Sequence, residues 1–225
     1  MGFGLLFFGY FAAFLMSLNS YGAVFALIGY YLMFTALQKL SEYKHSLIYC
    51  YPPLAALTLC SVSDTVNLIF KLLDMTEPFG GTVISYIISL VSLASGLILH
   101  LFLLGAISGL GKDTDLPEIV GLTRTNLSAV SVYFILNIVV FVLNLLNRPI
   151  SLLMVLGMLL RIVYPLLVLS LIYKCFSKIC APEDVDMPVK PSRFEFINKI
   201  RERQEQKAEE TRAAREKILK NKNKK

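Results

Sequence analysis

The stretch "GMLLRIVYPLLVLSLIY", residues 157–173, decides the fold class, because nearly all of its side chains are aliphatic or aromatic. A run of about 18 or more apolar residues is long enough to cross the hydrocarbon core of a bilayer as a helix. Similar runs recur along the 225 residues, of which 56% are hydrophobic. The sequence therefore predicts an all-α fold, a polytopic membrane helix bundle.

We expect about six transmembrane helices within residues 1–173, followed by a tail. The expected spans are residues 3–18, 21–37, 53–70, 82–106, 127–146 and 150–173. Polar stretches separate them, and the longest, residues 111–126, is expected to form a loop. In the first span Gly9, Ala13 and Ser17 recur at four-residue spacing. Such a stripe of small residues favours close helix packing in lipid.

The net charge of +6 belongs to the C-terminal region, because residues 1–173 hold 7 basic and 7 acidic residues. Prolines and charges predict a linker over residues 174–192 and a basic, charged helical tail over residues 193–225, frayed at its end. The positive-inside rule places this tail in the cytoplasm, and with six spans both termini share that side. The compact loops favour a bacterial cell membrane. A bilayer is thus an expected partner, and nucleic acid is not.

A small apolar patch and several basic side chains begin the predicted tail helix. The candidate interaction residues in it are Arg193, Phe194, Ile197, Ile200, Arg201 and Arg203. Clustered Lys and Arg on the cytoplasmic side of a span favour docking to a protein partner or to anionic lipid. A solvated helix without a partner is the alternative.

Polar and ionisable residues inside the expected spans are candidate functional sites, because each is costly to place in a membrane. The members of this candidate polar node are Asp64, Asn67, His100, Asn137, Asn144, Arg161 and Pro165. Pro165 has no N–H, so the helix should kink where the carbonyl of Arg161 loses its partner. Arg161 is expected about 7–8 Å deeper than Asp64, a gap that its side chain can close. We therefore predict an Asp64–Arg161 ion pair, which either serves function or only fixes helix register.

One face of the expected span 82–106 is small and polar. The residues on it are Ser85, Ser89, Ser92, Gly96 and His100. Such a face should turn toward neighbouring helices, because lipid offers hydroxyl groups no partners. His100 would then either relay protons or hold a hydrogen bond within the bundle.

The sequence contains no recognised catalytic, metal-binding or phosphate-binding motif. Cys175 and Cys180 lack a neighbouring histidine, which argues against zinc. We therefore predict no enzyme activity and no cofactor. The predicted function is a non-enzymatic accessory, assembly or scaffolding role through the basic tail. The alternative is a small transporter or permeation subunit with a midplane polar site at Arg161, Asp64 and His100. A water-accessible cavity at these residues would favour transport, and a dry, paired cluster would favour the structural role.

Overall fold

The computed structural model describes residues 2–18, 21–76, 78–80, 82–146 and 150–179, which form helices and their connections without a strand. The α-helices are α1 (Gly2–Tyr10), α2 (Gly22–Ser41), α3 (Tyr51–Leu72), α4 (Thr82–Asp113), α5 (Pro117–Leu145) and α6 (Ser151–Lys178). A π-helix, η1 (Phe11–Leu15), and a 3₁₀-helix, η2 (Met16–Leu18), extend α1, and a second 3₁₀-helix, η3 (His45–Cys50), leads into α3. The prediction of an all-helical protein is confirmed.

Within the described residues, five helical stretches are long and apolar enough to cross a membrane. They are α2, η3 with α3, α4, α5 and α6. The N-terminal stretch Gly2–Leu18 is apolar but shorter. Large apolar side chains point outward from the long helices; Leu59, Val83, Leu152 and Met158 are between 69% and 76% exposed. An apolar outer surface of this kind suits a bilayer and not water.

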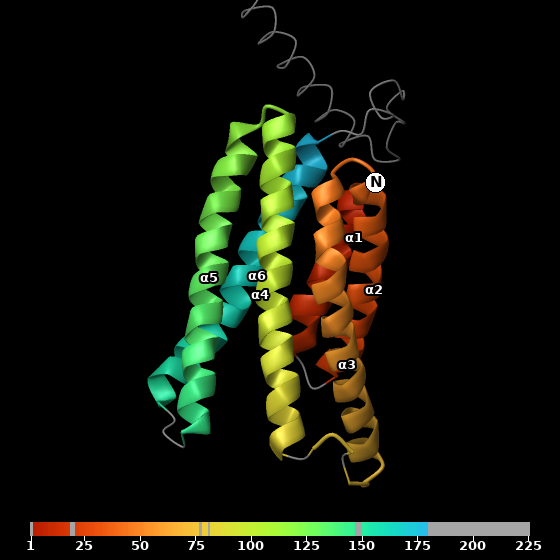
Figure 1. The fold of residues 1–225 in the computed structure, drawn as a ribbon, viewed down its shortest axis with the longest axis vertical. Helices are drawn as coiled ribbons and strands as arrows, with labels where there is room; N and C mark the ends of the chain where they lie inside the picture. The colour runs from red at the N-terminus through yellow and green to blue at the C-terminus, as the bar shows by residue number, and fades with distance from the viewer. Residues whose placement is uncertain (1, 19–20, 77, 81, 147–149, 180–225) are drawn as a thin grey trace, which may run out of the picture. The chain divides into compact units, whose positions relative to one another are not determined.

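Each helix packs against the next in sequence and α6 packs back against α1, so the helix contacts close into a ring. One end of this ring, which we call the proximal end, holds the start of α1, the link 42–44, the turn 114–116 and the end of α6 (Figure 1). The ends of α3 and α5 and the starts of α4 and α6 lie at the opposite, distal end. The stretch Gly2–Leu18 spans only about 25 Å at 1.5 Å per residue, against about 48 Å for α4. The ring is therefore more completely filled in its proximal half.

The first contact in this ring is a backbone contact between the N-terminal stretch and α2. A Cβ atom placed on Gly29 would lie 2.3 Å from the nitrogen of Ala13 and 2.6 Å from the carbonyl oxygen of Gly9. No side chain fits in that space. The stripe of small residues predicted from Gly9 and Ala13 therefore packs as close helix contacts in lipid require.

The connection between α4 and α5 differs from the expected loop. Only residues 114–116 lie outside the two helices, and Asp115 adopts a left-handed conformation with φ 51°. The N–H of Leu116 donates to the carbonyl of Gly111 at 2.8 Å. Both helices continue into the predicted loop because Leu110 and Ile119 are buried in the core. The loop prediction for residues 111–126 is wrong, since it weighed polarity above these spaced apolar residues.

Candidate functional site

A cavity of about 480 Å³ lies among the helices and reaches the distal end, where Phe79 lines it. Its lining comes from η1, η2 and all five long helices, beginning with Ala13, Phe14, Ser17, Tyr30, Leu57, Asp64, Asn67, Phe79, Ser85, Ile88 and Ser89. The remaining lining residues are Ser92, Leu93, Gly96, Tyr133, Phe134, Asn137, Val140, Phe141, Asn144, Arg161 and Tyr164. A second cavity of about 410 Å³ shares Asp64, Asn67 and Arg161 with it. We call the two together the distal cavity.

The structure brings five members of the predicted polar node together at this cavity. They are Asp64 and Asn67 on α3, Asn137 and Asn144 on α5, and Arg161 on α6. The other two members, His100 and Pro165, are buried and do not line it. The residues predicted from sequence as one node therefore divide into two environments.

Asp64 and Arg161 line the same cavity without forming the predicted ion pair. Among the described residues, the ion pairs join Lys44 to Asp113 and Glu118 to Lys174 and Lys178. The side chains of Asp64 and Arg161 form no hydrogen bond with another residue in the described part of the chain either. Arg161 and Asp64 are both exposed, so water can solvate both charges. The pairing prediction is wrong because helix rise gave only their relative depth, and the cavity lies between helices.

The asparagines at the cavity have different partners. The side-chain oxygen of Asn67 accepts a hydrogen bond from the N–H of Phe79 at 3.0 Å, which ties the connection between α3 and α4 to α3. The amide nitrogen of Asn137 donates to the carbonyl of Tyr133 one turn earlier, at 2.8 Å. Asn144 lines the cavity, and its side chain makes no hydrogen bond with a described residue. Asn67 and Asn137 thus shape the cavity wall, and Asn144 adds a polar group to it.

The polar face of α4 forms another wall. Ser85, Ser89, Ser92 and Gly96 line the cavity, as expected for a face that turns away from lipid. A Cβ atom on Gly96 would lie 3.1 Å from the ring of Phe134, so the missing side chain allows that ring to close against α4. The wall is consequently polar toward the distal end and ends against aromatic rings.

Three aromatic side chains close the inner end of the cavity: Phe14, Phe134 and Tyr164. Their ring centroids lie 5.0–5.6 Å from that of His100, which is completely buried behind them. We call these three rings the aromatic floor. The stacked pair Tyr133–Tyr164, with centroids 4.2 Å apart, continues the floor into the cavity wall.

His100 has a partner on each ring nitrogen. Nδ1 lies 2.7 Å from the carbonyl oxygen of Gly96, and Nε2 lies 2.7 Å from the hydroxyl of Tyr10. A carbonyl oxygen can only accept, so Nδ1 carries the proton and donates; in the neutral ring Nε2 then accepts from the Tyr10 hydroxyl. His100 is therefore a structural histidine that joins α1 to α4, and it has no open position toward the cavity.

Sequence reasoning missed Tyr10, Tyr30 and Asn126. Tyr10 holds His100, and Tyr30 lines both parts of the distal cavity. The amide nitrogen of Asn126 is buried and donates to the carbonyl of Leu167 at 3.2 Å, which joins α5 to α6. A tyrosine or asparagine in an apolar run gives no signal of its partner, although a polar group in a span signals that one is needed.

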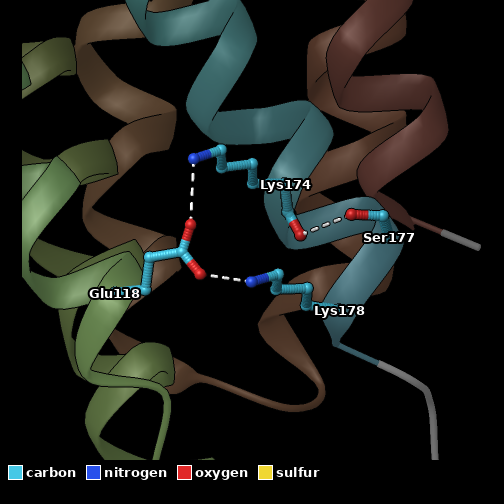
Figure 2. A network of polar contacts seen from close by, with 4 residues as sticks. All are labelled: Glu118, Lys174, Ser177 and Lys178. Carbon is cyan, nitrogen blue, oxygen red and sulfur yellow. Dashed lines mark hydrogen bonds and ion pairs between the residues drawn. The ribbon is translucent and has the colours of Figure 1, made fainter. Parts of the chain in front are cut away.

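Ion pairs gather at the proximal end. One carboxylate oxygen of Glu118 on α5 binds Lys174 of α6 at 2.9 Å, and the other binds Lys178 (Figure 2). Lys44 binds Asp113 at 2.6 Å, which ties the link between α2 and η3 to the end of α4. Helix α6 runs to Lys178, past residue 174 where the linker was expected. Lys174 and Lys178 are four residues apart and share a helix face, so both reach Glu118 only if the helix continues.

The tail residues proposed for partner or lipid binding lie outside the described residues, so the tail-centred role stays a prediction. Among the residues described, His, Cys, Asp and Glu side chains form no group of three that could hold a metal ion. A comparison with known proteins finds no matching family model, no matching curated protein and no matching solved structure.

Proposed function

We propose that this protein binds a small polar solute in the distal cavity and passes it across the bilayer through the ring of helices. The observation that supports this most is that Asp64 and Arg161 line one cavity of about 480 Å³ without pairing. A node that served only to fix helix register would pair its charges, because an unpaired charge inside a bundle is costly. The volume is within the roughly 300–1,000 Å³ typical of small-molecule sites.

The proposal includes six crossings, with the N-terminal stretch as the first, and both termini in the cytoplasm. The proximal end of the described helices holds Lys44, Lys112, Lys174 and Lys178, whereas Lys71 lies at the distal end. Excess Lys and Arg mark the cytoplasmic side of a membrane protein. In this orientation the distal cavity opens away from the cytoplasm, and the aromatic floor lies on its cytoplasmic side.

Passage of a solute then requires the aromatic floor to part. Phe14, one of its three rings, belongs to the π-helix η1. A π-helical turn departs from the regular hydrogen-bond ladder and is found frequently at functional positions. The floor is therefore the expected gate, and α1 with η1 is the element expected to move.

The test is osmotic swelling of liposomes that contain the full chain. The probes are iso-osmotic solutions of chloride and carboxylate salts, amine salts, and neutral or zwitterionic solutes, with an ionophore that balances charge. At least one class of solute should swell these liposomes faster than protein-free liposomes, and Arg161→Gln should slow that swelling. Arg124→Gln, an exposed arginine outside the distal cavity, is the matched control. If no class of solute enters faster than in protein-free liposomes, the proposed function is wrong.

A further inference from the structure

The distal cavity holds one positive and one negative side chain, and their separation bears on what it binds. Arg161 and Asp64 line both parts of the cavity, and no ion pair or hydrogen bond joins their side chains to each other or to another described residue. A guanidinium group binds carboxylate or phosphate oxygens through two parallel hydrogen bonds. A carboxylate binds ammonium groups. Each side chain is therefore available to a ligand group of opposite charge.

A ligand with a single charge is poorly matched to this arrangement. An anion at Arg161 would be repelled by Asp64, and a cation at Asp64 would be repelled by Arg161, in surroundings less polar than water. A ligand that carries both charges meets two attractions instead. It also has no net charge, so the membrane potential does no electrical work on its passage.

The rest of the lining suits a short ligand with charged ends. Asn144, Ser89 and Ser92 offer hydrogen-bonding groups, and Tyr30, Tyr133 and Phe134 offer ring faces and edges. Aromatic faces attract ammonium groups as well as hydrocarbon. A cavity of about 480 Å³ admits a molecule of several carbon atoms between its charged groups.

From these features we infer that the distal cavity takes a small zwitterion, whose anionic group pairs with Arg161 and whose ammonium group pairs with Asp64. The inference rests on the proposed function, since it names the class of solute that the cavity binds. The same chemistry occurs in free amino acids and in the headgroups of zwitterionic lipids, and the experiment separates these two sources.

The experiment measures binding to the purified full chain by isothermal calorimetry, with thermal unfolding as a check of folding. The probes are glycine, 3-aminopropanoate, 4-aminobutanoate, 5-aminopentanoate and 6-aminohexanoate, with butanoate and butylammonium as ligands of one charge. Glycerophosphocholine represents the lipid headgroup. One chain length should bind best, about tenfold or more tightly than either ligand of one charge, because it spans the gap between Arg161 and Asp64. Tighter binding of glycerophosphocholine than of every amino acid assigns the site to lipid headgroups, and the reverse order assigns it to free solutes.

Variants of both charged residues decide between a zwitterion and a simple ion. Arg161→Gln and Asp64→Asn should each weaken binding of the best zwitterion by about tenfold or more, whereas Arg161→Lys should retain part of it. The matched controls, Arg124→Gln and Asp115→Asn, alter exposed residues outside the distal cavity and should bind as the unaltered chain does. Each variant must keep its melting temperature without ligand, so that loss of binding reports the site and not the fold.

The outcomes that overturn the inference differ from those that overturn the proposed function. If butanoate binds as tightly as 4-aminobutanoate and Asp64→Asn has no effect, the site takes an anion; the zwitterion inference fails and the proposed function stands. If no zwitterion binds while another solute swells the liposomes, the zwitterion inference likewise fails and the proposed function stands. If no probe binds and no solute enters the liposomes, both fail.

Discussion

The two halves of the helix ring differ in how their ionisable side chains are paired. In the proximal half His100 has a partner on each nitrogen, Glu118 binds two lysines, and Lys44 binds Asp113. In the distal half Asp64 and Arg161 line a cavity without a partner among the described residues. Polar groups that are paired hold helices together, and polar groups that are left open remain available to water and solutes. The pairs of the proximal half thus link its helices, and the distal half is the part suited to binding.

The largest effect is expected at the backbone contact between α1 and α2. Gly29→Ala should lower the free energy of unfolding by about 1–3 kcal/mol, because its Cβ would lie 2.3 Å from the nitrogen of Ala13. Gly121→Ala is the matched control, since no heavy atom lies within 4 Å of that Cβ position. The control should be neutral or stabilising, because alanine favours a helix more than glycine does. Denaturant titration in detergent measures both, and equal effects would contradict close packing of α1 on α2.

A smaller loss is expected at the histidine behind the aromatic floor. Tyr10→Phe removes the hydroxyl that donates to Nε2 of His100 and leaves that buried nitrogen without a partner. The free energy of unfolding should fall by about 1–2 kcal/mol. Tyr31→Phe, at a tyrosine that is 69% exposed, should change it little. If the two variants are equally stable, the hydrogen bond between Tyr10 and His100 does not hold the proximal half.

The ion pairs of the proximal end should contribute less, because they are exposed. Glu118→Gln removes the negative charge that pairs with Lys174 and Lys178 between α5 and α6. The melting temperature should drop slightly at low salt, and the difference from the unaltered chain should vanish at high salt, where exposed charges are screened. Glu42→Gln, an exposed glutamate outside these pairs, is the control. A loss that persists at high salt would show that Glu118 acts through packing instead.

The sequence predicts the helical fold well, because long apolar runs and small-residue spacing are local signals. The packing of Gly9 and Ala13 against Gly29 and the inward serine face of α4 follow from residues on one helix. The short turn 114–116 could not be predicted from one helix, because the burial of Leu110 and Ile119 depends on the residues that pack against them. The described residues form five long apolar helices and one shorter apolar stretch. The shorter stretch lies near the minimum length for crossing a bilayer, so the sequence does not fix the number of crossings.

The candidate site is only partly readable from sequence, because pairing is decided between helices. Helix rise placed Arg161 about 7–8 Å deeper than Asp64, within reach of its side chain, and both residues line the distal cavity. Helix rise could not show that they remain apart, nor that Tyr10 from the N-terminal stretch would take the hydrogen bond of His100. Such partners lie 90 residues apart in sequence, and no property of either residue alone indicates the other.

The central claim, that Asp64 and Arg161 are separate charges at an open cavity, is tested most directly by a double-mutant cycle. Asp64→Asn, Arg161→Gln and the double variant are unfolded without ligand, and the coupling free energy is measured. Residues that do not interact directly are additive within about 0.5 kcal/mol, and that is the expected result. A coupling of about 2 kcal/mol or more, with the double variant more stable than either single one, would show a buried ion pair and contradict the account.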